Sequence, residues 1–390
     1  MMFDSRIAVV SPSLVRANYI QPLLRELAKI FPDTILLCGE FPGFLPTCRQ
    51  SFKVKELPGM RVFGQDEKIK FRWLPLSLFG ELRKARPDIV LIGQFTMWTF
   101  YVALYKAIYG CRVVFLWDGT VPSCAFKNSP LRLLWRRVLA RFVDAAISNT
   151  REGVDYLSDI IHIPRSKIQQ LIHLVADADS LCCEWKGDKP SLVSDGGPVF
   201  LYVGSLSRRK GVRFLLQAAA QLVEGGANNF SIVVVGEGDQ EYLRSSISQE
   251  IERYIQIVGP VQYTELGKYY ENCDAFILPS REDVWGMVVS EAMAFKKAIL
   301  CSKYANAKEI IEHGVNGFIF DPLHPTELSS YMLEIIRNPG LAKQLGRATR
   351  AFAERNSPVG AAHRIAEVLI NPNALNRQAC LADLSDARGQ

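Results

Sequence analysis

Short apolar segments alternate with amphipathic segments along most of this 390-residue chain. Residues 212–223 show the helical part of the pattern, because Val212, Leu215 and Leu216 recur at helical spacing before two glycines at 225 and 226. Such alternation predicts parallel sheets covered by helices on both faces. The predicted strands are 6–11, 34–38, 89–92, 113–117, 145–148, 199–203, 231–235, 255–258, 275–278 and 298–301, and a further helix is predicted over 19–31.

The length predicts two domains, because one hydrophobic core rarely supports so many residues. The strands form two series, and the stretch 177–198 between them is rich in Gly, Asp, Ser and Pro, as linkers are. We therefore predict two doubly wound α/β domains, 1–178 and 199–352, joined by a linker at 179–198, with ligands bound in a cleft at the carboxyl ends of the strands. A helix over 353–371 is expected to cross back to the first domain, before a polar tail at 372–390.

Composition narrows the classes of partner and compartment. A net charge of +6 without dense basic clusters argues against a nucleic-acid partner. Nine cysteines, an odd number without CxxC spacing, favour free thiols in the cytoplasm over disulfides or a zinc site. The five histidines show no ligand spacing, so no metal is predicted. The start, with Asp4, does not resemble a secretion signal, and 89–109 is broken by polar residues, which favours a buried strand and helix over a membrane span.

The segment 279–293 combines features of a nucleotide-sugar site. Asp283 and Glu291 lie eight residues apart, on an acidic loop with a glycine and at the predicted opening of a helix. Carboxylates there accept hydrogen bonds from ribose or sugar hydroxyls, and amides at a helix start favour an anionic phosphate. The same residues fit an acidic first turn that only complements the helix dipole, and this segment alone favours neither interpretation.

This segment resembles the Glu-x7-Glu signature of family 4 glycosyltransferases, with Asp283 in the first acidic position and Glu291 in the second. Three other elements are similar to motifs of the same family: 203–206 with 210–211 to its Gly-Arg-Leu…Lys-Gly turn, 235–238 to its Gly-x-Gly, and 314–318 with 321–322 to its Gly-x-Asn-Gly element. The resemblance implies the GT-B fold, in which two Rossmann-like domains face a central cleft. It also implies metal-independent, retaining transfer of a hexose-type sugar from a nucleotide-diphosphate donor to a glycan or lipid-linked acceptor, as in polysaccharide biosynthesis.

The resemblance also implies roles for individual residues. Glu291 would hold the donor ribose, and Asp283 would lie against the donor sugar. Lys210 would stabilise the leaving diphosphate, an effect often worth about 3–4 kcal/mol, although the basic run 208–210 also fits a solvated turn. No cofactor is expected beyond the donor, a UDP-, GDP- or ADP-sugar. The other expected donor contacts are Gly204, Ser205, Arg209, Gly236, Gly238, Glu282, Gly286, Met287 and Val288.

Three further motifs have a second interpretation. The glycines at 236 and 238 also fit a dinucleotide-binding turn, but Glu241 stands where the third glycine belongs, which argues against an NAD enzyme. Asp177 and Asp179 resemble the metal-binding Asp-x-Asp of the other large glycosyltransferase fold, but they fall in the predicted linker and are interpreted as structural. Asp118, a predicted catalytic residue, stands where the family commonly has a histidine facing the donor sugar, and it fits an Asp-Gly turn equally well.

A basic amphipathic helix is predicted from about residue 129 to 142. No acid occurs between Asp118 and Asp144. Packing on the domain core is the simpler interpretation, and docking on an anionic membrane surface is the second. The apolar face consists of Leu131, Leu134, Trp135, Val138, Leu139 and Phe142, and the basic face of Arg132, Arg136, Arg137 and Arg141.

The chain departs from the family pattern at several positions. Ser205 replaces an arginine in the first phosphate turn, and Asp283 is one methylene shorter than the usual Glu. The glycine-rich loop usual after the first strand is replaced by residues 11–18. A competing hypothesis is therefore a non-catalytic nucleotide-sugar-binding or scaffold protein of the same fold. Retention of Lys210, Glu291 and an acid at 283 favours the enzyme.

Overall fold

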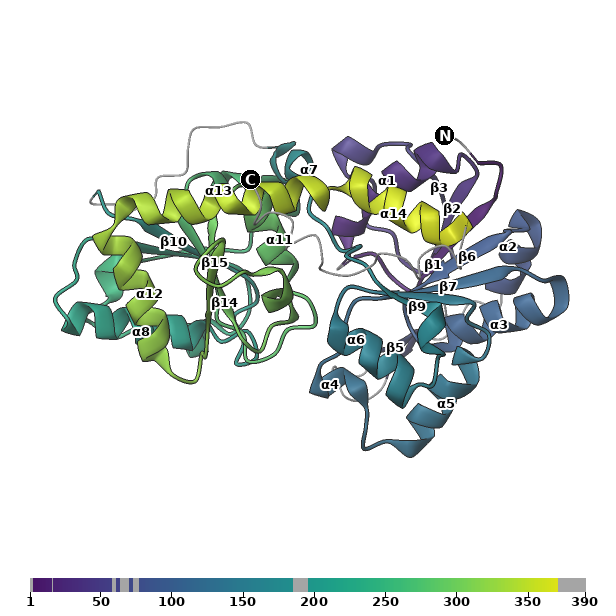
Figure 1. The fold of residues 1–390 in the computed structure, drawn as a ribbon, viewed down its shortest axis with the longest axis horizontal. Helices are drawn as coiled ribbons and strands as arrows, with labels where there is room; N and C mark the ends of the chain where they lie inside the picture. The colour runs from purple at the N-terminus through teal and green to yellow at the C-terminus, as the bar shows by residue number, and fades with distance from the viewer. Residues whose placement is uncertain are drawn as a thin grey trace. The chain divides into compact units, whose positions relative to one another are not determined.

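The computed structural model describes residues 3–15, 17–57, 61–63, 70–72, 77–184 and 196–370, with only the backbone of 61–63 and 70–72. The chain divides into two compact units (Figure 1). Unit 1 is Met1–Leu174 with Pro358–Gln390, and unit 2 is Val175–Ser357. Each unit is built on one parallel sheet, and the two are described separately below.

The sheet of unit 1 has the strand order β3-β2-β1-β6-β7-β8-β9, and every neighbouring pair is parallel. The chain therefore starts in the middle, runs to one edge and returns to build the other side, as in Rossmann-like folds. The strands are β1 (Ile7–Ser11), β2 (Thr34–Cys38), β3 (Lys53–Glu56), β6 (Ile89–Ile92), β7 (Arg112–Trp117), β8 (Ala145–Ser148) and β9 (Ile168–Gln170). A separate antiparallel pair is formed by β4 (Arg61–Phe63) and β5 (Lys70–Arg72).

The helices of unit 1 connect these strands. They are α1 (Gln21–Ile30), α2 (Ser77–Ala85), α3 (Met97–Tyr109), α4 (Pro122–Ala125), α5 (Pro130–Ala140), α6 (Arg151–Asp155) and α14 (Pro358–Ile370). Helix α6 continues as a π-helix over Tyr156–Ile160. Helix α14 comes from the far end of the chain and lies beside α1 (Figure 1).

Unit 2 repeats this plan with the order β12-β11-β10-β13-β14-β15, again with all pairs parallel. Its strands are β10 (Val199–Val203), β11 (Ser231–Val235), β12 (Ile255–Gly259), β13 (Ala275–Leu278), β14 (Ala298–Ser302) and β15 (Gly317–Phe320). Its helices are α7 (Ala178–Cys182), α8 (Val212–Glu224), α9 (Gln240–Arg244), α10 (Gly267–Glu271), α11 (Met287–Ala294), α12 (Pro325–Arg337) and α13 (Pro339–Arg355). Helices α8 and α12 pack side by side on this sheet (Figure 1).

The central strands are buried along their whole length. Each residue of β6, β8, β10, β11, β13 and β14 is shielded from solvent, which explains why these segments read as continuous apolar runs. Each of the ten predicted strands is present, with ends that agree within one residue, and the predicted two-domain α/β class is confirmed. Strand β3, with sequence KVKE, was not predicted, because it lies exposed at a sheet edge and has no apolar run.

Three local predictions need correction. Helix α11 begins at Met287 rather than at Glu291, so the carboxylate stands in the second turn of that helix. The predicted linker begins with helix α7, and its residues 185–195 lie outside the described part, as does the predicted tail. Helix α3 was predicted to be buried, but Met97, Leu104 and Ile108 on it are exposed.

The predicted C-terminal helix over 353–371 is divided in the structure. Residues 353–355 end α13 in unit 2, whereas α14 belongs to unit 1. The guanidinium of Arg112, at the start of β7, donates hydrogen bonds to the carbonyls of Val368 and Leu369 in the last turn of α14. A cation at this position complements the helix dipole and satisfies terminal carbonyls.

Replacing Arg112 with Met should loosen α14. A hydrogen bond from a charged donor contributes about 1.5–3 kcal/mol, so we expect the amides of α14 to exchange with solvent at least about tenfold faster. Hydrogen-exchange mass spectrometry measures this. Arg83→Met, on the exposed side of α2, is the matched control and should leave α14 unchanged. Equal protection of α14 in both variants would contradict the assigned role of Arg112.

Candidate functional site

Three turns meet at one edge of the sheet of unit 2. They follow β10, β11 and β13, which are adjacent in the sheet, and carboxyl ends of parallel strands lie at the same edge. The turn after β10 carries the predicted Gly204, Ser205, Arg209 and Lys210. The turn after β11 carries Gly236 and Gly238, and the loop after β13 carries Glu282, Asp283, Gly286, Met287, Val288 and Glu291. The structure therefore brings the residues predicted in the second domain to one edge.

The turns after β10 and β11 contact each other through their backbones. Leu206 N–H donates to the carbonyl of Glu237 over 2.8 Å, and Asp239 N–H donates back to the carbonyl of Leu206 over 3.0 Å. A Cβ atom at Gly236 would lie 1.9 Å from the carbonyl oxygen of Gly204. Gly236 is therefore required for the close approach of these two turns, which leaves exposed backbone at the sheet edge.

The turn after β10 is also fixed to the loop after β13. Arg281 N–H donates to the carbonyl of Arg209, and the guanidinium of Arg209 donates to the carbonyl of Glu282, each over 2.9 Å. Gly211 has φ +70°, and a Cβ there would lie 2.1 Å from the carbonyl oxygen of Pro279. These contacts hold Lys210 beside the acidic loop.

Lys210 and Asp283 form a mostly buried ion pair. The distance from Nζ to Oδ2 is 2.5 Å, and the side chains are 17% and 10% exposed. Ser280 Oγ lies 3.5 Å from the same carboxylate oxygen. Each charge neutralises the other in a site where little water reaches them, so the pair fixes the position of both groups.

Glu291 is buried next to this pair and makes a hydrogen bond to Tyr270. The Tyr270 hydroxyl donates to Glu291 Oε2 over 2.7 Å. Burial raises the pKa of Glu291 to about 7, although the hydrogen bond from Tyr270 and the charge of Lys210 both act to lower it. The carboxyl group therefore changes its protonation state close to neutral pH.

The N-terminus of α11 lies between the two carboxylates in sequence. Gly286 precedes the helix with φ +95°, and Met287 and Val288 are its first two residues. The first amides of a helix have no partner within the helix and favour a negative charge. The first amides of α11 are therefore those of Met287 and Val288, which were already among the expected donor contacts.

In unit 1, Asp118 lies next to a histidine that was not singled out from the sequence. Asp118 follows β7, and its carboxylate lies 3.4 Å from Nε2 of His173. His173 is 1% exposed, and its Nδ1 has no hydrogen-bond partner among the described residues. The side chain of Asn149 accepts from the amide of His173 over 2.8 Å and donates to the carbonyl of Asp118 over 3.3 Å.

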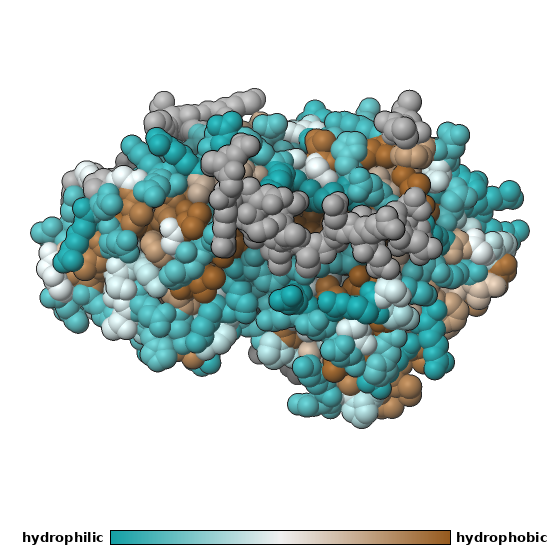
Figure 2. Space-filling view, in the orientation of Figure 1, coloured by the Kyte–Doolittle hydropathy of each residue, from teal (hydrophilic) through white to brown (hydrophobic). Residues whose placement is uncertain are grey.

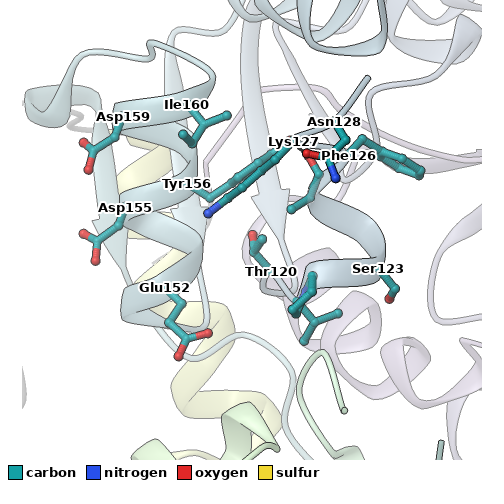
Figure 3. A pocket seen from close by; sticks show the side chains of 13 residues that line it. Thr120, Ser123, Phe126, Lys127, Asn128, Glu152, Asp155, Tyr156, Asp159 and Ile160 are labelled. Carbon is teal, nitrogen blue, oxygen red and sulfur yellow. Dashed lines mark hydrogen bonds between the residues drawn. The ribbon is translucent and has the colours of Figure 1, made fainter. Parts of the chain in front are cut away.

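A pocket of about 650 Å³ opens in unit 1 beside the carboxyl ends of β7 and β8. Figure 3 shows Thr120, Ser123 and Phe126 on one side of it and residues of α6 and the π-helix on the other. Glu152, Asp155 and Asp159 belong to that second side, and the ring of Tyr156 reaches toward the first. The carboxylates of Asp155 and Asp159 point away from the first side in Figure 3, and Lys127 also lines the pocket, so its lining combines acidic, basic and aromatic residues.

Two contacts at these sites were not predicted from the sequence. Tyr270 meets Glu291 across 21 residues of chain, and no local pattern reports such a contact. His173 follows β9, so predicting that strand would have pointed to it, but a strand of three residues is too short to be recognised.

Asp177 accepts a hydrogen bond from Ser180 Oγ within the first turn of α7. Within residues 3–15, 17–57, 77–184 and 196–370, no cluster of three His, Cys, Asp or Glu side chains is placed to hold a metal ion.

Comparison with protein families identifies both halves of the chain. Residues 17–172 match the family Glycosyltransferase Family 4, and residues 184–352 match Glycosyl transferases group 1. An uncharacterized glycosyltransferase from Methanocaldococcus jannaschii is 27% identical over 172 residues, which cover 44% of this chain and 47% of that protein. The alpha-D-kanosaminyltransferase of Streptomyces kanamyceticus is 23% identical, with 62% of each chain covered. The chain thus spans about half the length of the first of these relatives.

Solved structures resemble the whole chain. Anabaena HepE in complex with UDP is 20% identical and superposes with a TM-score of 0.74, covering 94% of this chain and 99% of that one. A sucrose-phosphate synthase of Thermosynechococcus elongatus is 16% identical, with a TM-score of 0.71, and covers 95% of this chain and 99% of that one. The fold is that of GT-B proteins with two Rossmann-like domains. The chain belongs to the group 1, family 4 glycosyltransferases.

The raised pKa of Glu291 predicts how the stability of unit 2 depends on pH. Between about pH 4.5 and 7 the folded protein holds a proton on Glu291 that the unfolded chain has lost, so stability falls as the pH rises through this window. The Glu291→Gln variant lacks this loss. Between pH 4.5 and 8 its free energy of unfolding should rise by about 3 kcal/mol relative to that of wild type, which corresponds to about 5–10 °C in Tm.

Thermal unfolding of both proteins from pH 4.5 to 8 measures this difference. Glu224→Gln, at the exposed end of α8, is the matched control and should follow wild type at each pH. Parallel curves for wild type and Glu291→Gln would show that Glu291 is ionised throughout this range.

Proposed function

We propose that this protein is a glycosyltransferase that moves a hexose-type sugar from a nucleotide-diphosphate donor to a hydroxyl of a glycan or lipid-linked acceptor. Transfer retains the anomeric configuration and needs no metal ion. The observation that supports this most is the convergence of Lys210, Asp283 and Glu291 with the N-terminus of α11 at one sheet edge. These groups match what a nucleotide-diphosphate sugar presents, since it carries hydroxyls at two ends and negative charge between them.

The donor diphosphate lies against the glycine turns and the first amides of α11 in this proposal. The backbone of Gly204 and Gly236 permits close approach, and the dipole of α11 favours the negative charge. Arg209 also borders this edge, with its guanidinium on the carbonyl of Glu282. Ser205 supplies no charge there, so Lys210 and the helix carry most of the electrostatic stabilisation.

Glu291 holds the ribose of the nucleotide. The Tyr270 hydroxyl bonds to Oε2, which leaves Oε1 to accept from a ribose hydroxyl. Carboxylate oxygens accept two such bonds readily, and the rigid burial of Glu291 reduces the entropy that binding would cost. Glu291 would therefore bind the part of the donor, the ribose, that UDP-, GDP- and ADP-sugars share.

Lys210 stabilises the leaving group. When the bond from the sugar C1 to the β-phosphate oxygen breaks, the electron pair stays on that oxygen, and the ammonium of Lys210 stabilises its charge. The acceptor oxygen bonds to C1 from the same face, and its proton passes to the departing phosphate. Asp283 holds Lys210 in place over 2.5 Å and lies where it can contact the sugar, without forming a covalent bond to it.

Asp118 and the pocket of unit 1 belong to the acceptor side of this proposal. The carboxylate of Asp118 is 52% exposed at the end of β7, and the pocket opens beside the same strand end. Because a carboxylate accepts hydrogen bonds from sugar hydroxyls, the exposed Asp118 suits a glycan acceptor in this region. UDP-glucose is the first donor to test, since structures of Anabaena HepE contain UDP and UDP-glucose.

Replacing Glu291 with Ala should weaken nucleotide binding while the fold is kept. Loss of a charged hydrogen-bonding partner costs about 1.5–3 kcal/mol, which is about 10- to 100-fold in Kd. Isothermal titration with UDP measures it, with GDP and ADP titrated if UDP does not bind. Glu224→Ala is the matched control. Unchanged affinity of Glu291→Ala for the best nucleotide would remove Glu291 from the donor site.

Replacing Lys210 with Ala should lower kcat by about two to three orders of magnitude and leave the KM for acceptor nearly unchanged. The reason is that the Lys210 charge acts mainly in the transition state. Arg213→Ala, three residues after Lys210 and exposed on α8, is the control and should keep full activity. A change confined to KM would place Lys210 in ground-state binding only.

The stereochemistry and metal independence are tested together. The anomeric coupling of the product, measured by NMR with excess chelator present, should equal that of the donor. An inverted product would exclude this mechanism, and so would activity that chelator abolishes and manganese restores. Tight nucleotide binding without transfer to any acceptor would favour the non-catalytic alternative.

A further inference from the structure

Helix α3 presents a row of large apolar side chains to solvent. Met97, Phe100, Leu104 and Ile108 follow one another at intervals of three and four residues, so they lie on the same face of the helix. Each is between 38% and 57% exposed. A helix that packs only on its own domain turns such a face inward, and here Trp98, Val102 and Tyr105 already provide the inward face.

Helix α5 presents a second row beside the first. Leu131 is 80% exposed, Leu134 is 60% exposed and Val138 is 37% exposed. The two helices touch where the ring of Trp135 stacks on Phe100, with 5.8 Å between the ring centroids. We call the seven residues Met97, Phe100, Leu104, Ile108, Leu131, Leu134 and Val138 the α3–α5 face. Figure 2 shows hydrophobic surface on the part of unit 1 where Figure 1 has these helices.

The buried side of α5 differs from the one that its sequence suggests. The apolar face predicted from the pattern includes Leu131, Leu134 and Val138, but the structure buries Leu139 and Ala140 and leaves those three in solvent. Packing on the core, the simpler interpretation, therefore accounts for only part of the helix. The unburied part is adjacent to the exposed row of α3.

The chain segment that contains this face is mostly basic. From residue 89 to 143 the chain has seven Lys or Arg residues and one acid, Asp118. Some of these cations are used inside unit 1: Lys106 pairs with Asp144, and Arg137 donates to the carbonyl of Ile160 over 2.9 Å. Arg132 and Arg141 are exposed on α5, at either end of its apolar row.

We propose that the α3–α5 face docks the protein on the surface of an anionic phospholipid bilayer. Apolar side chains on two adjacent helices, with exposed arginines beside them, match an interface in which acyl chains lie under negative headgroups. Among the described residues no helix is long and apolar enough to cross a membrane. Helices of 13 and 11 residues instead lie in the plane of the interface, with Trp135 at its edge.

A bilayer fits this face better than a second copy of the chain. Two copies that met through it would bring Arg132 and Arg141 of each toward the same residues of the other, and like charges would oppose the contact. A negative bilayer surface removes that repulsion. Docking is independent of the proposed transfer reaction, so it is measured with no donor present.

Vesicle flotation tests the proposal directly. The full chain should bind vesicles of phosphatidylglycerol and phosphatidylcholine in equal parts at low salt, and bind vesicles of pure phosphatidylcholine at least tenfold more weakly. Arg132→Gln with Arg141→Gln should lower partition to the anionic vesicles about 30-fold, because each cation near the surface contributes about fivefold. Arg213→Gln with Arg347→Gln, both exposed in unit 2, is the matched control and should bind as wild type does.

The apolar contribution is tested by Ile108→Gln with Leu134→Gln. Both side chains are more than half exposed, so the variant should fold, and its partition should fall at least tenfold. Leu323→Gln, on an exposed leucine of unit 2, is the control and should bind normally. Circular dichroism and Tm of each variant should equal those of wild type.

Three results would overturn the proposal. The first is that wild type fails to bind anionic vesicles at low salt. The second is that the control variants lose binding as much as the α3–α5 variants do. The third is that sedimentation shows a dimer of wild type and a monomer of the variant with Ile108→Gln and Leu134→Gln, which would assign the face to a second copy of the chain. Loss of transferase activity with vesicle binding intact would count against the proposed function and leave the docking face standing.

Discussion

The hydrogen bonding between fully buried parallel strands is the constraint on which the rest of unit 2 depends. Parallel strands point the same way, so the segments after β10, β11 and β13 all emerge at one edge of the sheet. Residues 32 to 87 positions apart in sequence, such as Gly204, Gly236 and Glu291, are collected there without any local interaction that joins them. Helices on both faces of the sheet leave this edge as the place where backbone amides and polar side chains can meet a ligand.

The charges at this edge are balanced within the protein. Asp283 neutralises Lys210, and burial raises the pKa of Glu291 to about 7. A mostly buried lysine without a partner would be unfavourable, which gives Asp283 a structural reason to be there besides any contact with a sugar. A negatively charged ligand changes this balance, because it offers Lys210 a second partner. The same electrostatics therefore stabilise the buried pair and are compatible with the anionic donor that we propose.

Unit 1 has the same sheet plan but a different surface. Its strand ends carry Asp118, Asn149 and His173, which are joined by hydrogen bonds and close contacts. A pocket with acidic, aromatic and lysine side chains in its lining lies beside them. Away from these ends, α3 and α5 leave apolar residues in solvent, where most domains of this kind would place polar ones. In our proposals, one unit binds the donor, and the other binds the acceptor and carries the surface that docks on a lipid bilayer.

The sequence by itself determined the fold class and indicated the three turns that meet at one edge of unit 2. The reason is that buried parallel strands are continuous apolar runs, and the glycines and acids of the turns stand at fixed distances after them. It did not determine β3, β9 or β15, since strands of three or four residues carry little periodic signal. It also did not determine the start of α11, which follows an acidic loop and begins with the apolar residues Met287 and Val288. Only the tertiary structure decided which partner each side chain meets: Asp283 for Lys210, Tyr270 for Glu291 and His173 for Asp118. It also decided which side of α5 is buried, because burial depends on the neighbouring helix and amphipathic spacing alone does not specify that neighbour.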